Sequence, residues 1–338
     1  MWKDRVIGGE IISEYLMEAR KLTKEFEVSV GMFKSRAKIR AVDEVSFGIK
    51  EGEQIALVGE SGCGKSTLGR LLLGLIKPSS GQILYKGRNI WRLSRKEFEE
   101  FRRNAQIIPQ NPYDALNPTK KLSAALIPQI LRHKIAKGRS EARKMALDLL
   151  EMVGLSPPED FIDRYPSRLS GGQMQRVVIA RAISVKPQFI VADEAVSMLD
   201  ASLRVEILDM MHKIGEELKT TFLLITHDLG VARYFAKNGK IAIMYLGDIV
   251  EIGETEEIIR NPLHPYTKAL LAAIPVPDPK IARERKSIPL KSIDVPSLLK
   301  PISGCKFHTR CPYAIEDCEK IKPELRLVGN RWVACHLT

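Results

Sequence analysis

The chain has 338 residues, of which 44% are hydrophobic and 28% are charged, so it can bury a sizeable core and hold one large domain plus an appendage. It contains no run of 18 apolar residues and no long apolar segment after the N-terminus, which argues against a membrane span and a secretory signal and for a protein that stays in the cytoplasm. The net charge of +12 is compatible with nucleic acid or an anionic membrane surface, but it is spread over both halves and indicates mostly solvated surface.

The pattern of residues in the first part of the chain predicts strands. Residues 1–15 carry little pattern and are expected to form an N-terminal extension. Strand-like segments follow at Leu16–Leu22, Val42–Ile49 and Gln54–Val58. Phe26 lies between the first two segments, where it is either a flat surface for stacking a nucleotide base or a core side chain, and the residues alone favour neither.

Residues 59–67 follow the pattern G-x-x-x-x-G-K-[ST], between an apolar strand and an apolar-periodic segment that runs from Leu68 to Ile76. In this strand–loop–helix arrangement the glycines let backbone N–H groups converge on a polyphosphate, and the helix start adds its positive end. Lys65 would reach the outer phosphates, and the Ser66 hydroxyl could bind Mg²⁺. The segment, called the phosphate loop below, predicts a nucleoside triphosphate site.

A helical insertion is expected next. A hairpin signal at residues 82–88 is followed by a charged helix at Ser94–Asn104 and a short strand that ends at Gln110. Residues 111–118 are rich in loop formers, and residues 121–153 show helical periodicity. These helices would separate two halves of a phosphate-binding core.

Two further motifs follow the insertion. Ser170 is a plausible N-cap for a helix from Gly172 to Ser184, and two glycines at the start of this helix permit close approach by an anion. The apolar strand Phe189–Ala192 then ends in Asp193 and Glu194, where ligands bind in open α/β sheets. Asp193 could hold Mg²⁺ through water, and Glu194 could orient or deprotonate an attacking water.

The last strand of this core is predicted at Thr221–Thr226 and is followed by His227, which could donate a hydrogen bond to a phosphate oxygen. Before it, residues 197–200 begin a turn into a helix at residues 202–218. His227 continues the series of polar residues at strand ends, which favours a functional role for it.

In order and spacing, residues 59–67, Gln110, residues 169–173, 193–194, 197–200 and His227 resemble the nucleotide-binding subunits of ABC transporters, over about residues 16–260. The resemblance implies an α/β P-loop core with an antiparallel β subdomain and a helical subdomain at about residues 92–183. It also implies a dimer in which each of two ATP molecules lies between the phosphate loop of one subunit and Ser170 and Gly172 of the other. Phe26 then matches the aromatic residue that stacks on adenine.

The roles implied for single residues fall into three groups. Catalytic roles are expected for Glu194, His227 and Gln110. Mg²⁺ ligands are expected at Ser66, Gln110 and Asp193. ATP contacts are expected at Phe26, Gly59, Ser61, Gly62, Cys63, Gly64, Lys65, Ser66, Thr67, Asp193, Ser170, Gly171, Gly172, Gln173 and Asp200.

Three segments are similar to the second ATPase of oligopeptide/dipeptide importers: residues 112–118, with Ala115 in place of the usual Ser, residues 261–271, and residues 276–279. Ala195 departs from the family, which usually has Pro there, but this position shapes a turn and not the chemistry.

The implied partners are a paralogous ATPase or a second copy of the chain, two transmembrane permease subunits and, indirectly, an extracytoplasmic solute-binding protein. The implied location is the cytoplasmic face of the membrane. The alternative is a soluble ABC ATPase acting on nucleic acid or ribosomes, but the chain has neither two cassettes nor a long coiled-coil insertion, so nucleic acid is not expected as a partner.

Residues 261–338 are expected to form a separate C-terminal extension. Six prolines between Ile274 and Pro301 indicate an extended linker, and four cysteines follow with the spacing C-x5-C-x6-C-x16-C. These cysteines are Cys305, Cys311, Cys318 and Cys335. The spacing lacks the paired C-x2-C of zinc ribbons, so a [4Fe–4S] cluster is at least as plausible as zinc, and free structural cysteines are a third possibility. The resemblance to importer ATPases, some of which carry such a cluster, favours iron–sulfur over zinc.

Overall fold

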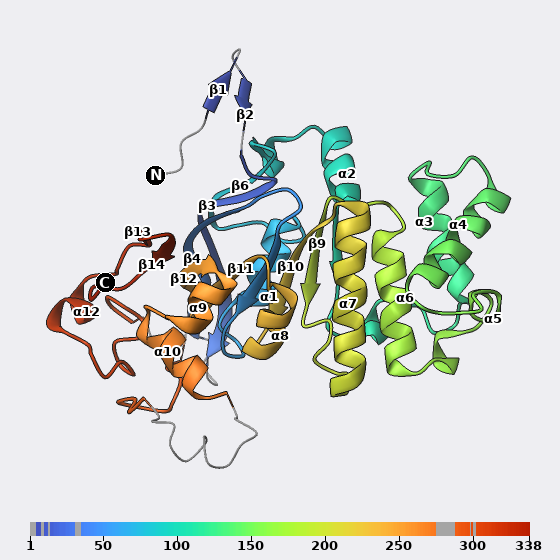
Figure 1. The fold of residues 1–338 in the computed structure, drawn as a ribbon. Coiled ribbons are helices and arrows are strands. Elements are labelled where there is room, and N and C mark those ends of the chain that lie inside the picture. The colour runs from blue at the N-terminus through green and yellow to red at the C-terminus, as the bar shows by residue number, and fades with distance from the viewer. Residues whose placement is uncertain are drawn as a thin grey trace. The chain divides into compact units, whose positions relative to one another are not determined.

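The fold is that of a computed structural model, which describes residues 5–7, 10–12, 14–30, 35–274, 288–297, 299 and 302–338. The chain divides into two compact units. Unit 1 comprises residues 1–49, 54–89 and 226–338, and unit 2 comprises residues 50–53 and 90–225. Figure 1 shows the elements of both.

Unit 1 contains an antiparallel sheet of four strands in the order β4-β3-β6-β7. Strands β3 (Met17–Val30) and β4 (Ser35–Ile49) pair along most of their length, and β6 (Ser80–Tyr85) pairs with β7 (Arg88–Asn89). The predicted hairpin at residues 82–88 is therefore confirmed. Strands β3 and β4 are longer than predicted, because their outer halves carry charged residues that pair across the strands, as Arg40 Nε does with Glu25 Oε1 at 3.0 Å.

The second sheet of unit 1 has the strands β13 (Arg326–Val328), β14 (Arg331–Val333), β12 (Asp248–Glu254), β11 (Lys240–Tyr245) and β5 (Gln54–Val58) in this order. Strand β5 runs parallel to β11, and the other pairs are antiparallel. A short hairpin, β1 (Arg5–Ile7) with β2 (Glu10–Ile12), lies in the predicted N-terminal extension. In its described residues, unit 1 has the helices α1 (Lys65–Leu72), α8 (Leu229–Phe235), α9 (Thr255–Arg260), α10 (Pro265–Ala272) and α12 (Glu316–Lys320).

The C-terminal extension is part of the core of unit 1, which differs from the separate appendage expected above. Strand β14 pairs with β12, so the extension continues the sheet (Figure 1, red). Phe307 is buried in one apolar cluster with Val58, Ile243 and Tyr245. The expected segment at residues 276–279 and four of the six linker prolines lie outside the described residues.

Unit 2 contains three parallel strands, β8 (Ala105–Ile108), β9 (Phe189–Asp193) and β10 (Thr221–Thr226), with β9 in the middle. Every residue of β9 and β10 is buried, as the continuous apolar runs predicted. Strand β8 ends two residues before Gln110, which leaves that residue in the following loop.

The helices predicted for unit 2 are confirmed with small shifts at their ends. They are α2 (Arg95–Asn104), α3 (Leu122–Arg132), α4 (Arg139–Met152), α6 (Gly171–Ile183) and α7 (Ala201–Leu218). The structure adds a short helix that was not predicted, α5 (Glu159–Ile162), and the 3-10 turns η1 (Ile90–Arg92), η2 (Pro112–Asp114) and η3 (Pro166–Arg168). Ser94 and Glu97 form a capping box at the start of α2. None of the helices in the described residues is long and apolar enough to cross a membrane.

Candidate nucleotide site

The phosphate loop connects β5 to α1, as its flanking residues predicted. Two of its glycines are fixed by their surroundings. Gly64 has φ 109°, and a Cβ atom there would lie 2.0 Å from the carbonyl oxygen of Ala41. A Cβ atom at Gly59 would lie 2.1 Å from the carbonyl oxygen of Met244. Neighbouring backbone therefore packs directly against the loop, and only glycine fits at these two positions.

Lys65 is buried inside the loop. Its ammonium group donates hydrogen bonds to the carbonyl oxygens of Gly59 at 2.8 Å and Glu60 at 2.9 Å. Ser61 and Gly62 are exposed at the turn of the loop, where backbone N–H groups can meet a phosphate. The arrangement places a positive charge at the centre of the loop, as a site for a polyphosphate requires.

A hollow of about 350 Å³ borders this loop in unit 1. One wall is formed by Glu60, Ser61, Gly62 and Cys63, and the other walls by Ile39, Tyr245, Leu246, Val295, Pro296, Ser297 and Leu299. The last four residues belong to the C-terminal extension. The extension therefore reaches the phosphate loop, which the sequence did not predict.

Phe26 and His227, the other expected site residues of unit 1, are both on the surface. The Phe26 side chain is 40% exposed on β3, opposite Ile39 of β4, so it is not a core residue. Lys24 Nζ lies 5.1 Å from the centre of its ring. His227 directly follows β10 and precedes Asp228, which caps α8 by accepting hydrogen bonds from the N–H groups of Gly230 and Val231.

The strand-end carboxylates of unit 2 lie as predicted. Asp193 is the last residue of β9 and is 6% exposed. Glu194 has φ 48°, a left-handed conformation that is uncommon for residues other than glycine, and its N–H donates to the carbonyl oxygen of Ile225 at 2.9 Å. Gln110 Nε2 donates to Glu194 Oε2 at 2.9 Å. Strained backbone of this kind is concentrated at functional sites.

Ser170 caps α6, as predicted. The Ser170 hydroxyl accepts a hydrogen bond from the N–H of Gln173, and the Gln173 side chain accepts one from the N–H of Ser170. The two glycines that follow have different surroundings. A Cβ atom at Gly172 would lie 2.2 Å from Leu203 Cδ2, whereas a Cβ atom at Gly171 would meet no described atom within 4 Å apart from its chain neighbours and the backbone of its own helix.

Asp200 also caps a helix. Its carboxylate accepts hydrogen bonds from the Leu203 N–H at 3.0 Å and the Ser202 hydroxyl at 2.9 Å, and these bonds lower the pKa of Asp200. The structure therefore brings together the loop residues 59–67 within unit 1 and Gln110 with Glu194 within unit 2.

Sequence reasoning missed the contacts that surround Glu60. The Glu60 N–H donates to the Tyr266 hydroxyl at 3.0 Å. Arg310 Nη1 lies 2.9 Å from Glu60 Oε2, and Arg310 Nη2 lies 3.1 Å from Glu60 Oε1. Neither Tyr266 nor Arg310 has a neighbour in the sequence that indicates such a contact.

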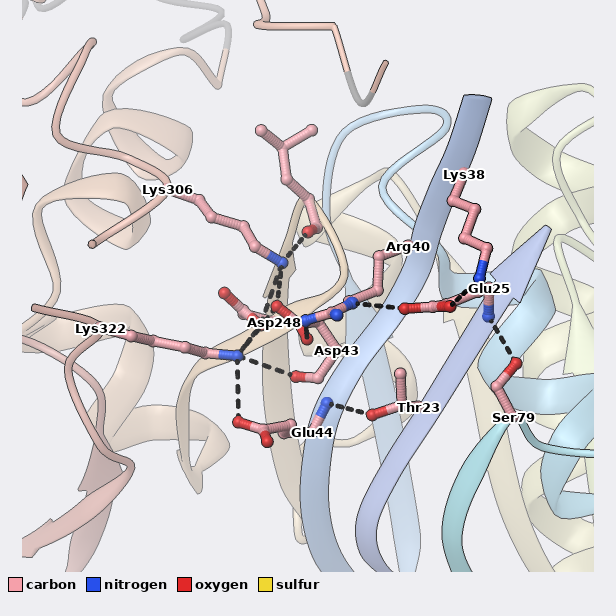
Figure 2. Close-up of polar contacts among 11 residues, drawn as sticks. Thr23, Glu25, Lys38, Arg40, Asp43, Glu44, Ser79, Asp248, Lys306 and Lys322 are labelled. Atoms are coloured by element: carbon pink, nitrogen blue, oxygen red, sulfur yellow. Dashed lines mark hydrogen bonds and ion pairs between the residues drawn. The ribbon is translucent and has the colours of Figure 1, made fainter. Parts of the chain in front are cut away.

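A second group of ion pairs joins the C-terminal extension to β4 and to Asp248, the first residue of β12. Figure 2 shows Lys306 and Lys322 directed at Asp43 and Asp248. Lys306 Nζ lies 2.9 Å from Asp43 Oδ2 and 3.2 Å from Asp248 Oδ1, and Lys322 Nζ lies 3.0 Å from each of these oxygens. Burial opposes ionisation of Asp43, but the two ammonium groups outweigh it and lower its pKa, whereas burial raises the pKa of Asp248.

The four cysteines of the extension lie within electrostatic range of one another. Burial raises the pKa of Cys305 to about 12, and the charges of Cys318, Cys335 and Cys311 add to this shift. All four are free thiols. In the described part of the chain, no three His, Cys, Asp or Glu side chains are arranged to hold a single metal ion. The structure thus gives no direct support for the expected iron–sulfur cluster or zinc ion.

The phosphate loop, the strand-end carboxylates and the capped glycine pair define a P-loop ATPase. The "ABC transporter" family matches residues 42–197, and the family "Oligopeptide/dipeptide transporter, C-terminal region" matches residues 250–318. The chain therefore belongs to the ATP-binding subunits of ABC transporters, in the group that carries this C-terminal region.

Relatives and solved structures agree with this assignment. The "Putative oligopeptide transport ATP-binding protein YkfD" of Bacillus subtilis is 44% identical over 95% of this chain and 95% of its own length. The "Probable peptide ABC transporter ATP-binding protein y4tS" of Sinorhizobium fredii is 43% identical over 96% of this chain and 91% of its own. A dimeric post-hydrolysis state of the ATP-binding cassette MJ0796, bound to ADP and Pi, matches with a TM-score of 0.61 and 31% identity, covering 71% of this chain and 98% of that one. The chain is an ATPase, and the alternative of a soluble ATPase for nucleic acid or ribosomes is not favoured.

Proposed function

We propose that the chain drives import of peptides through a membrane permease by ATP-dependent closure of a dimer. The observation that carries this proposal is the hydrogen bond between Gln110 and Glu194. Gln110 lies in the loop that also presents Tyr113, whose side chain is 59% exposed. Binding of this loop to another protein can therefore change the position of the Glu194 carboxylate through Gln110.

In the hydrolysis step, Glu194 orients and deprotonates the attacking water, and Gln110 holds its carboxylate. Lys65 and the loop N–H groups bind the phosphates. Ser66, Gln110 and Asp193 would hold Mg²⁺, which when bound would offset the negative charge on the phosphoryl group. His227 donates a hydrogen bond to the outer phosphate. Phe26 stacks on adenine, which its exposed ring supports.

The second half of each ATP site comes from another subunit, either a paralogous ATPase or a copy of this chain. The open surroundings of Gly171 and the exposed Ser170 support this assignment, because the start of α6 is accessible to a phosphate from outside the chain. Gln173 and Asp200 lie beside it as caps of α6 and α7.

The permease contact is assigned to a groove of about 1190 Å³ in unit 2. Eight lysine and arginine side chains line it against two glutamates, Glu99 and Glu100. Burial and the charges of Arg103 and Arg132 lower the pKa of His133 in this groove. The proposed occupant is a permease segment with acidic side chains, which the positive lining of the groove supports. The proposed location of the chain is the cytoplasmic face of the membrane.

Transport is tested in cells that lack this chain. The wild-type chain is expected to restore uptake of labelled trialanine, and Glu194→Gln is expected to restore none, because hydrolysis falls by a factor on the order of 10² or more. Glu217→Gln is the matched control, since this glutamate is 47% exposed and pairs only with Lys213 among the described ion pairs. Uptake of an oligosaccharide or metal complex, and not of trialanine, would contradict the peptide assignment.

The four cysteines are proposed to hold a [4Fe–4S] cluster. Their mutual electrostatic contact and the burial of Cys311, Cys318 and Cys335 support a shared ligand. Zinc ribbons favour paired C-x2-C spacing, which these cysteines lack, whereas a [4Fe–4S] cluster bonds each of four thiolates to its own iron. When bound, the cluster would supply structural cross-linking or a redox response.

Metal analysis of the full chain, purified without oxygen, tests this proposal. About four irons and four sulfides per chain are expected. Replacing Cys305 by Ser should remove them, and Cys63→Ser, at a cysteine in the phosphate loop, should not. Zinc alone, or no metal, would overturn the cluster and leave the ATPase assignment unchanged.

A further inference from the structure

We infer that the C-terminal extension positions the phosphate loop for ATP binding, with Arg310 and Tyr266 as positioning residues that act through Glu60. The inference rests on the ATPase activity of the family and on contacts within unit 1. It assigns a role in nucleotide binding to Tyr266 and Arg310, which lie 206 and 250 positions after Glu60 in the sequence.

Glu60 is held at three points. Its carboxylate forms a bidentate ion pair with the Arg310 guanidinium, with N–O distances of 2.9–3.1 Å. Its N–H donates to the Tyr266 hydroxyl at 3.0 Å, and its carbonyl oxygen accepts from Lys65 Nζ at 2.9 Å. The contacts with Tyr266 and Arg310 of the extension therefore fix the orientation of the peptide units of Glu60. The Glu60 carbonyl oxygen in turn fixes the position of the Lys65 ammonium group.

Arg310 is itself rigidly placed. Its side chain is 6% exposed, and its guanidinium lies 5.7 Å from the ring centre of Tyr245 and 5.8 Å from that of Phe307. A planar guanidinium that makes two parallel bonds to a carboxylate fixes direction as well as distance, which an ammonium group cannot do. Burial also protects the pair from screening by salt.

Tyr266 is placed by α10, of which it is the second residue. His264 Nδ1 accepts a hydrogen bond from the Tyr266 N–H at 3.0 Å and so caps α10, and burial lowers the pKa of His264 to about 3, which keeps the ring neutral and able to accept. The Tyr266 ring lies 4.6 Å from that of Tyr245 and 5.4 Å from that of Phe307. Burial raises the pKa of the Tyr266 hydroxyl, so the group that receives the Glu60 N–H is neutral.

The test measures the Kd of a fluorescent ATP analogue with Mg²⁺ on the full chain, together with the Tm of the same samples. Arg310→Gln and Glu60→Gln are each expected to raise the Kd on the order of ten-fold, since each removes a hydrogen bond to a charged group that orients the loop. Arg310→Lys should give a smaller rise, because it keeps the charge and loses the two-pronged geometry. The double variant Glu60→Gln, Arg310→Gln should bind as weakly as either single variant, because both residues act through one contact.

Arg331→Lys is the matched control. Arg331 is another arginine of the extension with a 5% exposed side chain, and it contacts Glu251, Glu257 and Asn261, none of which is in the phosphate loop. It should lower the Tm and leave the Kd unchanged. The inference is overturned if Arg331→Lys raises the Kd as much as Arg310→Lys, if the effects of Arg310→Gln and Glu60→Gln simply add, or if the Arg310 variants change only the Tm. Failure of the wild-type chain to bind the analogue would instead contradict the ATPase assignment.

Discussion

Glu194 combines two properties at one position. Its carboxylate is held by Gln110, and its backbone has φ 48°, which costs a residue with a side chain about 1–2 kcal/mol relative to glycine. Seven other described residues with side chains also have positive φ, so this conformation alone does not identify a catalytic residue. The proposed role of Glu194 rests on its carboxylate at the end of β9 and on the contact with Gln110.

Two substitutions separate the strain from the chemistry. Glu194→Ala and Glu194→Gly both remove the carboxylate and should abolish ATP hydrolysis to the same extent. The glycine variant should have a free energy of unfolding about 1 kcal/mol higher than the alanine variant, because only glycine adopts this φ without strain. Chemical denaturation of the two purified variants measures the difference. Equal stabilities would show that the backbone at residue 194 is not strained.

Sequence reasoning succeeded at this scale wherever one motif contains all the chemistry. The phosphate loop, the cap at Ser170 and the strand-end pair at Asp193 were placed correctly, because local spacing determines each of them. Arg310 could not be found in this way. Its partner Glu60 is 250 positions away in the sequence, and an arginine beside a cysteine has no distinctive pattern.

At the scale of elements, helix α6 shows how two adjacent glycines serve different purposes. Gly172 makes room for Leu203 of α7, whereas an added Cβ atom at Gly171 would meet no described atom within 4 Å beyond its chain neighbours and its own helix backbone. The sequence predicted close approach at both, but it could not tell packing within the chain from approach by an outside group. That distinction depends on α7, which begins 30 residues later.

Replacing each of these two glycines by alanine is expected to affect stability differently. Gly172→Ala should lower the free energy of unfolding by about 1–2 kcal/mol, because the new methyl group displaces Leu203, and Leu203→Ala should restore much of the loss. Gly171→Ala should leave the Tm unchanged or slightly higher, since alanine favours helix. It should still weaken ATP-dependent dimer formation, measured by light scattering on a hydrolysis-deficient background. A lowered Tm in Gly171→Ala would contradict the open surroundings of this residue.

At the scale of the whole molecule, ion pairs as well as apolar packing hold the extension against the rest of unit 1. Lys306 and Lys322 share Asp43 and Asp248, with Arg40 and Glu44 at the margin of the group (Figure 2). The site motifs were accessible to sequence reasoning, but this attachment was not, and neither was the full length of β3 and β4. Lysines and aspartates occur throughout a chain that is 28% charged, so their pairing appears only once the fold brings them together.

The attachment predicts a specific pH dependence. The lowered pKa of Asp43 means that its ion pairs stabilise the fold above the pKa of the unfolded carboxyl, about 3.9, and that this contribution is lost as the pH falls towards the folded value. Asp43→Asn should therefore lower the free energy of unfolding by about 3 kcal/mol at pH 7. The difference from wild type should shrink below pH 4. Thermal unfolding across this range measures it.

Glu44→Gln is the control for this prediction. Glu44 lies 3.8 Å from Lys322 and its side chain is 62% exposed, so its loss should cost less than about 1 kcal/mol at any pH. A difference between Asp43→Asn and wild type that stays constant down to pH 3 would show that the buried carboxylate is not ionised in the folded chain.

The position of β14 has one more consequence. By pairing with β12, β14 covers backbone N–H and C=O groups that would otherwise be exposed at the edge of the sheet. The edge strand is instead β13, which has three residues and begins with Arg326. Short, charged edge strands resist pairing with other molecules, whereas a longer apolar strand such as β12 can pair with them. A protein cut before β13 would therefore expose a surface on which further chains can add, and its first defect would be self-association.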